Sequence, residues 1–329
     1  MNFSISGTVW TEVDTVRGKE KVLKYYFIVN PGSRTGGSSQ LWKKLLDRLE
    51  KSGRDYEVYY TGDSSDAKKA AQQICAEDTS MKRIVVVGGD GTLDEVVNGL
   101  PMNGKYILGV IPTGSSNDYA RGMSISLEPE TAFNHVMNPR RFVKVDRGSV
   151  LLDDKDTVKF AVSSGFGYDA QICYCALTSG LKKFLNRFHM GKLVYYLIGL
   201  RLIASCRRTK ATVIIDGKHR IKCDKLVFAA VMNTRYEGGG MPMGPDADPT
   251  DGKLTVCLVH DISRLRHLSY MPTVIKGNHI RKKGVEEITC TTCEIITDEP
   301  MYVHTDGEYA GRRKHALFSC DPGKMKLML

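Results

Sequence analysis

Strand-like and helix-like segments alternate over the first third of the chain, and this alternation restricts the possible folds more than any other feature. Short apolar runs such as 24–30 and 83–87 are each followed by a segment whose apolar residues recur at helical spacing, as in 41–49 and 93–100. Strands that are joined through helices within one sheet form right-handed crossovers. The pattern therefore predicts an α/β N-terminal domain with a doubly wound, mostly parallel sheet.

The pattern changes at about Phe142, where successive strand-like runs separated by turn dipeptides replace the alternation. A helical excursion over about Gly180–Arg208 interrupts these runs. We therefore expect a second, larger and mainly antiparallel β domain with a helical excursion. The predicted organisation is an N-terminal extension of unknown role over 1–22, the α/β domain over 23–141, the β-rich domain over 142–312, and a C-terminal segment over 313–329 that returns to the first domain.

The charge balance favours a partner that carries negative charge. Lys plus Arg number 47 and Asp plus Glu number 37, which gives a formal net charge of +10. A nucleotide, a nucleic acid and an acidic membrane surface would each match this excess. The chain has no helix-turn-helix, RNP or zinc-finger signature, so nucleic acid is not an expected partner.

Two further features predict a cytoplasmic location. The N-terminal residues lack the apolar region of a secretory signal, and the longest apolar stretch, Leu193–Ser205, is interrupted by Arg201 and is shorter than the ~20 residues that a membrane span needs. The nine cysteines are scattered, and their odd number is typical of reduced thiols. We therefore expect no membrane-spanning helix.

Three glycine-rich loops follow predicted strands, at 30–37, 88–92 and 112–117. In an open α/β sheet, ligands bind outside the carboxyl ends of the strands. Glycine lets backbone amides approach phosphate oxygens, and the helix that follows offers N–H groups to an anion. Asp90 could hold Mg²⁺ or a ribose hydroxyl. Turn geometry alone also enriches such loops in Gly, Ser and Asp, but three of them at one predicted edge favour a phosphate site.

Four motifs resemble the diacylglycerol kinase catalytic-domain family, in order and at ordinary spacing. They are Val29-Asn-Pro-Gly-Ser33, Val87-Gly-Gly-Asp-Gly-Thr-Leu-Asp-Glu-Val-Val-Asn-Gly99, Ile111-Pro-Thr-Gly-Ser-Ser-Asn-Asp-Tyr-Ala-Arg121 and Thr305-Asp-Gly-Glu308. The family includes bacterial soluble diacylglycerol kinases, sphingosine and ceramide kinases and YegS-like lipid kinases. The resemblance runs from about Tyr25 to the C-terminus and implies a two-domain fold related to that of NAD kinases, with ATP in the cleft. The chain has neither a P-loop motif nor a dinucleotide fingerprint.

The resemblance also implies which residues contact ATP. The implied set is Asn30, Pro31, Gly32, Ser33, Arg34, Gly36, Thr61, Gly88, Gly89, Asp90, Gly91, Thr92, Glu95, Thr113, Gly114, Ser115, Asn117 and Asp118. Two positions depart from the family pattern. Asp94 stands where Asn is usual, which adds negative charge near the triphosphate, and Gly37 stands where many members have Lys or Arg. Arg34 offers a replacement for that lost charge.

Phosphoryl transfer to a hydroxyl needs a carboxylate that takes the proton, and Asp306-Gly307-Glu308 offers two. If this segment is extended, both side chains point to one face. The alternative is a simple hairpin turn, for which Asp-Gly is a strong signal. The resemblance favours a catalytic element, and it leaves open whether Asp306 or Glu308 is the base. For the neighbouring His304 we expect a packed or hydrogen-bonded side chain.

The loop Gly244–Leu254 contains three Asp residues among Pro and Gly. Oxygen ligands crowded into a tight turn suit a hard cation such as Mg²⁺, although an ordinary acidic loop has the same composition. The matching loop of bacterial family members resembles a structural Mg²⁺ site. Carried over by position, Asp251 would contribute its side chain, while Asp248 and Lys253 would contribute backbone carbonyls.

Basic and aromatic residues are interleaved through the helical excursion, from Lys182 to Arg208. A basic amphipathic segment can bind an anionic bilayer, and a solvated helix face has the same pattern. Together these features predict an ATP- and Mg²⁺-dependent lipid kinase of phospholipid metabolism that is cytoplasmic and peripherally membrane-associated. Diacylglycerol is the leading acceptor, with sphingoid bases, ceramide and phosphatidylglycerol left open.

Two alternatives to a lipid kinase stay open at this point. One is a kinase for a soluble acceptor, similar to NAD kinases, and the other is a non-catalytic nucleotide- or lipid-binding module. The sequence also leaves the oligomeric state open, a homodimer included.

Overall fold

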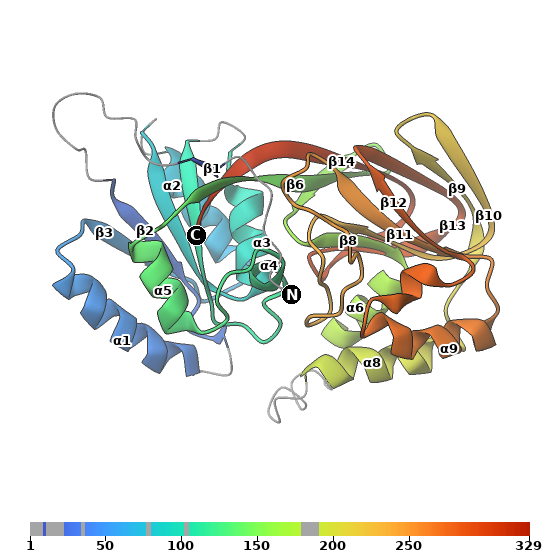
Figure 1. The fold of residues 1–329 in the computed structure, drawn as a ribbon, viewed down its shortest axis with the longest axis horizontal. Helices are drawn as coiled ribbons and strands as arrows, with labels where there is room; N and C mark the ends of the chain where they lie inside the picture. The colour runs from blue at the N-terminus through green and yellow to red at the C-terminus, as the bar shows by residue number, and fades with distance from the viewer. Residues whose placement is uncertain (1–8, 11–22, 34–36, 77–79, 102–104, 179–190) are drawn as a thin grey trace. The chain divides into compact units, whose positions relative to one another are not determined.

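The computed structural model describes residues 9–10, 23–33, 37–76, 80–101, 105–178 and 191–329. The chain divides into two compact units, which are 1–145 with 323–329, and 146–322. Figure 1 shows an α/β arrangement in the first unit and a β-rich arrangement in the second. The fold class expected from the sequence is therefore confirmed.

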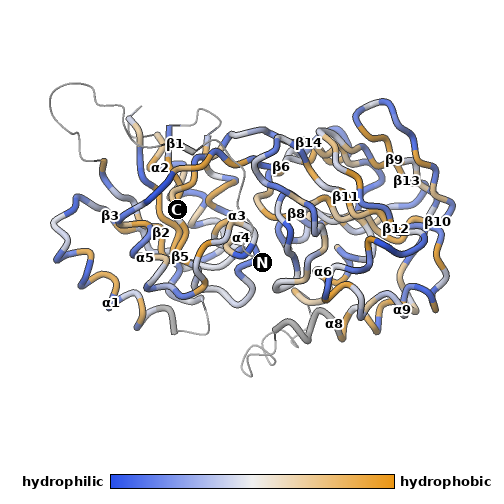
Figure 2. The backbone as a smooth tube through the Cα atoms, viewed as in Figure 1, coloured by the Kyte–Doolittle hydropathy of each residue, from blue (hydrophilic) through white to orange (hydrophobic). Residues whose placement is uncertain are grey.

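The first unit is built on a parallel sheet. Its strand order is β3 (Tyr56–Tyr60), β2 (Tyr25–Val29), β4 (Lys82–Gly88), β5 (Tyr106–Pro112) and the end of β14 (Glu308–Met328). Every residue of β2, β4 and β5 is buried, because helices cover both faces of the sheet. This double burial explains why these strands are continuous apolar runs in the sequence, which Figure 2 shows as orange segments.

Two layers of helices cover this sheet. One layer contains α1 (Gly37–Lys51) and α5 (Pro129–Met137), whose apolar side chains share a core with alternate residues of β2 and β4. The opposite layer contains α2 (Asp66–Ala76) and α3 (Asp90–Gly99), which pack on each other and on β2 and β4, and the short α4 (Asp118–Gly122) follows β5. The two layers are visible in Figure 1.

The second unit is mainly antiparallel. Its strands are β7 (Asp156–Phe160), β8 (Ser163–Gly167), β9 (Thr209–Ile215), β10 (His219–Met232), β11 (Leu254–His260), β12 (Val285–Cys290), β13 (Thr292–Thr305) and most of β14. They pair in the order β12-β11-β10-β8-β13-β14, and β9 pairs with both β10 and β13. Alternate residues of these strands form one buried core.

Helices pack on the second unit's sheet through a separate core. These are α6 (Tyr168–Thr178), α8 (Gly191–Leu202) and α9 (Arg264–Val274). The short 3₁₀ helix η2 (Asn278–Arg281) packs against α9 and β12. The expected helical excursion contains α8, and its residues 179–190 lie outside the described part of the chain. No helix among the described residues is long and apolar enough to cross a membrane.

Two strands carry the chain between the units. β6 (Phe142–Leu152) starts in the first unit, where it pairs with β1 (Val9–Trp10), and continues into the second unit, where it pairs with β7. β14 runs the other way, so that Gly323–Leu329 belongs to the first unit and extends its sheet beside β5. The first unit therefore consists of two segments that are far apart in the sequence.

Candidate functional site

The three glycine-rich loops of the first unit are joined by side-chain hydrogen bonds. They follow β2, β4 and β5, which are neighbours in a parallel sheet, so their carboxyl ends lie along one edge. The Asn30 side-chain amide donates to Thr92 Oγ1 at 3.1 Å, and the hydroxyls of Ser33 and Thr113 lie 2.7 Å apart. The loops predicted from the sequence to bind phosphate therefore come together.

The loops after β4 and β5 touch through backbone atoms at two glycines. A Cβ on Gly114 would lie 2.5 Å from the Cα of Gly89, so neither position has room for a side chain. Asn117, which is in the left-handed region with φ 53°, closes the second loop. Its side-chain amide accepts from Gly114 N and donates to Gly114 O, both at 3.0 Å. Close backbone packing of this kind suits a loop that must approach a phosphate.

The amino end of α3 lies in the same group of loops. Its N-cap residue is Gly89, which makes no side-chain cap hydrogen bond. The first amides of a helix have no partner within the helix, and together with the helix dipole they form an anion-binding site. Gly91 and Thr92 supply such amides.

Asp90 has a structural partner in α4. Its carboxylate accepts hydrogen bonds from the backbone amides of Asp118 at 3.0 Å and Tyr119 at 3.2 Å, at the first turn of that helix. Burial raises the pKa of Asp90, while these amide hydrogen bonds oppose the rise. Asp90 therefore fastens the loop after β4 to the loop after β5. Its proposed contact with Mg²⁺ or ribose stays a prediction.

The other residues of the predicted ATP set lie at or near the same edge. The Thr61 amide donates to Val29 O at 2.9 Å, so Thr61 follows β3 beside the end of β2. Glu95 points to the amino end of α2, where its carboxylate accepts from the Ala67 amide at 3.1 Å. Pro31, Gly32, Gly88, Ser115 and Asp118 lie on the joined loops or directly beside them. Arg34 and Gly36 lie outside the described residues.

Asp94, which replaces the family's usual Asn, is a buried residue of α3. Asn98, one turn further along this helix, donates to its carboxylate at 2.9 Å. The added negative charge is therefore partly offset by a hydrogen bond within α3.

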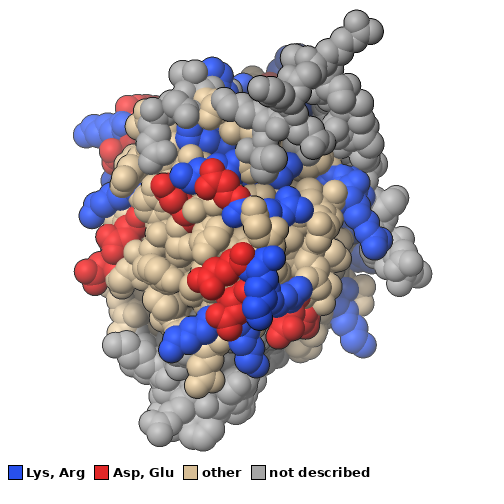
Figure 3. Space-filling view, turned by 90° about the vertical axis from the view of Figure 1, so that its left-hand side faces the viewer, with Lys and Arg blue, Asp and Glu red and all other residues tan. Residues whose placement is uncertain are grey.

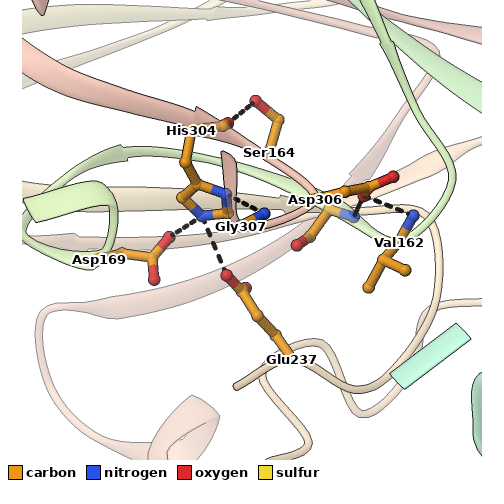
Figure 4. Close-up of polar contacts among 8 residues, drawn as sticks. Val162, Ser164, Asp169, Glu237, His304, Asp306 and Gly307 are labelled. Carbon is orange, nitrogen blue, oxygen red and sulfur yellow. Dashed lines mark hydrogen bonds and ion pairs between the residues drawn. The ribbon is translucent and has the colours of Figure 1, made fainter. Parts of the chain in front are cut away.

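In the second unit, Asp306 and Gly307 form the hairpin turn between β13 and β14. Both have positive φ, 47° and 87°, so the segment is not extended and the two carboxylates do not share a strand face, contrary to the sequence-based expectation. The Asp306 carboxylate turns instead toward three successive backbone amides. Those of Ala161, Val162 and Ser163 donate to it at 2.7, 2.8 and 2.9 Å. Figure 4 shows the contact with Val162.

Glu308 differs from Asp306 in its surroundings. It is the first residue of β14, it pairs in register with Thr305, and it is exposed. Among the residues that the structure describes, none donates a hydrogen bond to its carboxylate. The turn therefore presents one carboxylate that is fastened to the backbone and one that is open to solvent.

A buried histidine supports this turn from behind. His304, at the end of β13, is fully buried, and its Nδ1 accepts from the Gly307 amide at 3.1 Å. Because Nδ1 accepts, the ring proton resides on Nε2, which lies 3.1 Å from Asp169 Oδ2 and 3.0 Å from Glu237 Oε1 (Figure 4). A Cβ on Gly165 would overlap both the Asp169 carboxylate and the His304 ring. The expectation of a hydrogen-bonded histidine is confirmed.

Glu237 is a buried carboxyl group beside His304. Burial raises the pKa of Glu237, the nearby negative charge of Asp169 raises it further, and His304 opposes the rise. Cys173, Glu237 and His304 place their ligand atoms within 4.8 Å of one another, as a metal site would. A metal bound there would have to displace the proton on His304 Nε2. The sequence had not indicated Asp169 or Glu237, because no local pattern connects them with His304.

The acidic loop of the second unit forms a hydrogen-bonded turn. Asp248 accepts from the amide and the hydroxyl of Thr250 at 3.0 and 2.7 Å, and Asp251 accepts from the Lys253 amide at 2.9 Å. Burial and the negative charge of Asp248 both raise the pKa of Asp251. A cation bound beside these oxygens would relieve that repulsion, so the donor set fits Mg²⁺.

Two family models match nearly the whole chain. "Diacylglycerol kinase catalytic domain" matches residues 24–150, and "YegS C-terminal NAD kinase beta sandwich-like domain" matches residues 164–329. The fold and these matches define a lipid kinase. The chain belongs to the diacylglycerol kinase catalytic-domain family, in the group that carries the YegS-type C-terminal domain. The resemblance inferred from the motifs is confirmed.

Individual relatives agree with this assignment. A diacylglycerol kinase from Bacillus subtilis is 28% identical over 86% of this chain and 89% of its own length. A diacylglycerol kinase from Mycobacterium tuberculosis is 27% identical over 89% of this chain and 91% of its own. A crystal structure of a diacylglycerol kinase from Bacillus anthracis has the same fold, with a TM-score of 0.72 and 23% identity over 94% of this chain and 98% of that one.

Proposed function

We propose that this lipid kinase transfers the γ-phosphoryl group of ATP to the hydroxyl of diacylglycerol and so forms phosphatidic acid. One observation carries the proposal: hydrogen bonds join the three glycine-rich loops around the amino end of α3. The chain also belongs to a family of diacylglycerol kinase catalytic domains. The relatives named diacylglycerol kinase, which align over most of the chain, favour this acceptor over other lipids.

The first unit would bind the nucleotide. Backbone amides at the start of α3 would donate to phosphate oxygens, and the hydroxyls of Ser33 and Thr113 would add two donors. The contact between Gly89 and Gly114 would let the phosphates lie against the backbone. Mg²⁺ that accompanies ATP supplies charge neutralisation on the transferred group.

The second unit would activate the acceptor. We assign proton removal from the lipid hydroxyl to Glu308, because its carboxylate is exposed and unengaged among the described residues. Asp306 would act as a positioning residue, because three amides already occupy its oxygens. His304 would hold the Gly307 amide and with it the shape of the turn.

The acidic loop would bind a second Mg²⁺ with a structural role. Asp251 would provide a carboxylate oxygen, and Asp248 and Lys253 would provide carbonyl oxygens. Thermal melting of the purified protein with Mg²⁺ and with EDTA tests this proposal. A Mg²⁺-dependent rise in the melting temperature that disappears in Asp251→Asn supports it, and an equal rise in both proteins contradicts it.

Transfer of radiolabelled γ-phosphate from ATP and Mg²⁺ into mixed micelles tests the main proposal. Separate micelles would hold diacylglycerol, sphingosine, ceramide or phosphatidylglycerol, with NAD as a soluble acceptor. We expect label in diacylglycerol and its loss in Glu308→Gln. Label in another lipid would correct the substrate, and label only in NAD would overturn a lipid acceptor.

A further inference from the structure

Helix α9 is fastened to the second unit by its inner face. The buried His267 ring meets the Tyr168 ring of α6 edge-on, with centroids 4.5 Å apart, and the Tyr168 hydroxyl lies 3.8 Å from the Met271 sulfur. Ser263 caps the helix by accepting from the Arg266 amide at 3.2 Å. The helix therefore presents a fixed outer face.

That outer face is apolar, which is unusual for an exposed helix. Leu265 is 81% exposed, Leu268 is 45% exposed and Ile275, at the C-cap, is 58% exposed. Pro272 lies between the last two and is also exposed. The spacing of three, four and three residues places all four side chains along one stripe of the helix. We call Leu265, Leu268, Pro272 and Ile275 the α9 stripe.

Cations surround the α9 stripe without carboxylates among them. The segment 263–284 contains no Asp or Glu and has six exposed cations, which are Arg264, Arg266, Lys276, Arg281, Lys282 and Lys283. None of the six forms an ion pair with a carboxylate in the described part of the chain. The Tyr270 hydroxyl donates to Lys283 O at 3.1 Å, which holds the last three cations beside α9.

The two carboxylates that flank this segment in the sequence are already engaged. Asp261 and Glu286 lie 2.9 and 2.8 Å from the two ring nitrogens of His260. By contrast, the face of the first unit shown in Figure 3 mixes Lys and Arg with Asp and Glu. Within the second unit, the segment 263–284 therefore carries a local excess of positive charge.

We propose that α9 and the basic segment 281–283 form the surface by which this kinase docks on an anionic bilayer. The α9 stripe would enter the boundary between headgroups and acyl chains, while the six cations would contact lipid phosphates. A second copy of this chain would bring the same cations against each other in a two-fold interface, which disfavours dimerisation through this face. The proposal rests on the assignment as a lipid kinase but not on which lipid is phosphorylated.

Vesicle sedimentation tests the proposal without any reaction. The purified protein would be mixed with vesicles of phosphatidylcholine alone, or of phosphatidylcholine and phosphatidylglycerol in equal parts, neither containing diacylglycerol. We expect binding to the anionic vesicles that weakens as salt is added. The double variant L265S/L268S should bind about tenfold more weakly, because it removes apolar area that enters the bilayer. The double variant R264Q/R266Q should also bind about tenfold more weakly or worse, because each cation near an anionic surface strengthens binding roughly fivefold.

Matched controls replace exposed side chains outside the segment 263–284. Tyr60→Ser replaces a side chain of the first unit that is 58% exposed, as a control for the leucine variant. Lys218→Gln neutralises a cation in a hairpin turn, as a control for the arginine variant. Both control variants should bind vesicles like the unchanged protein. Phosphorylation of a water-dispersed, short-chain diacylglycerol should be equal in L265S/L268S and the unchanged protein. A loss of kinase activity in all proteins would count against the proposed function alone, since the vesicle assay contains no acceptor.

Two results would overturn the docking proposal. One is equal vesicle binding by L265S/L268S and the unchanged protein. The other is a dimer, detected by light scattering, that L265S/L268S dissociates while no protein binds vesicles, because the α9 stripe would then contact a second copy of the chain.

Discussion

Asp306 and Glu308 are separated by one glycine, yet they have different surroundings and should respond differently to substitution. Asp306→Asn removes the charge that accepts three amide hydrogen bonds, so we expect a loss of about 2 kcal/mol in the free energy of unfolding. Glu308→Gln should leave stability within about 0.5 kcal/mol and lower kcat at least about a hundredfold. Urea unfolding and steady-state kinetics measure both effects. A kcat that falls only in Asp306→Asn, with unchanged stability, would assign the base to Asp306.

The network around His304 gives a second prediction for single residues. His304→Ala should lower the free energy of unfolding by about 3 kcal/mol, because it leaves Asp169 and Glu237 buried side by side without the ring between them. The double variant His304→Ala/Glu237→Gln should recover part of this loss, since it removes one of the two facing carboxylates. Urea unfolding of the unchanged protein, the two single variants and the double variant provides the comparison. Additive losses in the double variant would contradict the interaction.

Single residues of the site were predictable where the signal is local. Gly89 and Thr113 directly follow apolar strands and Thr92 lies in the first turn of the next helix, so sequence position alone indicated that they lie at one edge. The partners of His304 come from α6 and from the loop after β10, and no local pattern connects them with β13. The Asp306 turn was an intermediate case, because Asp-Gly is compatible with a hairpin and with a catalytic motif.

Among the elements, α9 should make the stability of the protein depend on pH. Burial, followed by the charge of Arg208, lowers the pKa of His267 to about 4. In the unfolded chain His267 has an ordinary pKa near 6.5, so between pH 6.5 and pH 4 it is protonated there but not in the folded state. The free energy of unfolding therefore falls as the pH drops from 6.5 toward 4. Relative to His267→Gln, the unchanged protein should lose about 2 kcal/mol between pH 7.5 and pH 5. Parallel urea midpoints for both proteins across this range would refute the assignment.

The loop after β5 gives a second prediction at this scale. Gly114→Ala places a Cβ against the backbone of Gly89, so the two loops must separate. We expect the Kd for ATP to rise at least about tenfold in isothermal titration calorimetry, with a small change in melting temperature. Gly62→Ala is the control, because its Cβ would approach only Asp66 Oδ2, at 4.0 Å. An unchanged Kd in Gly114→Ala would count against nucleotide binding at these loops.

The elements themselves were predictable to different extents. The parallel strands and α1 to α3 have a clear period in the sequence and were expected. Helix α9 was not, because Pro272 and alternating cations obscure its period, and its outward face is apolar where a globular helix is usually polar. Its helical form depends on packing against α6 and α8, which a single sequence does not show.

For the whole molecule, the last residues should matter to the first unit. Gly323–Leu329 adds a strand beside β5 and buries Met325, Leu327 and Met328, while Leu329 O accepts from the amides of Arg140 and Arg141. Deleting 323–329 should destabilise the first unit by roughly 5 kcal/mol and abolish ATP binding, because β5 leads directly into one of the three loops. Calorimetric ATP binding and hydrogen exchange of β5 measure this, with the exposed Lys324→Ala as control. Normal ATP binding by the shortened chain would refute it.

The divided first unit also affects how the protein is made. Its final strand is synthesised only after the whole of 146–322 has been made. At translation rates of about 5–20 residues per second, β5 stays an unpaired apolar edge for roughly 10–40 s. Such an edge can pair with a neighbouring nascent chain. Crowded polysomes and strong overexpression are therefore the conditions under which this fold is most exposed to aggregation.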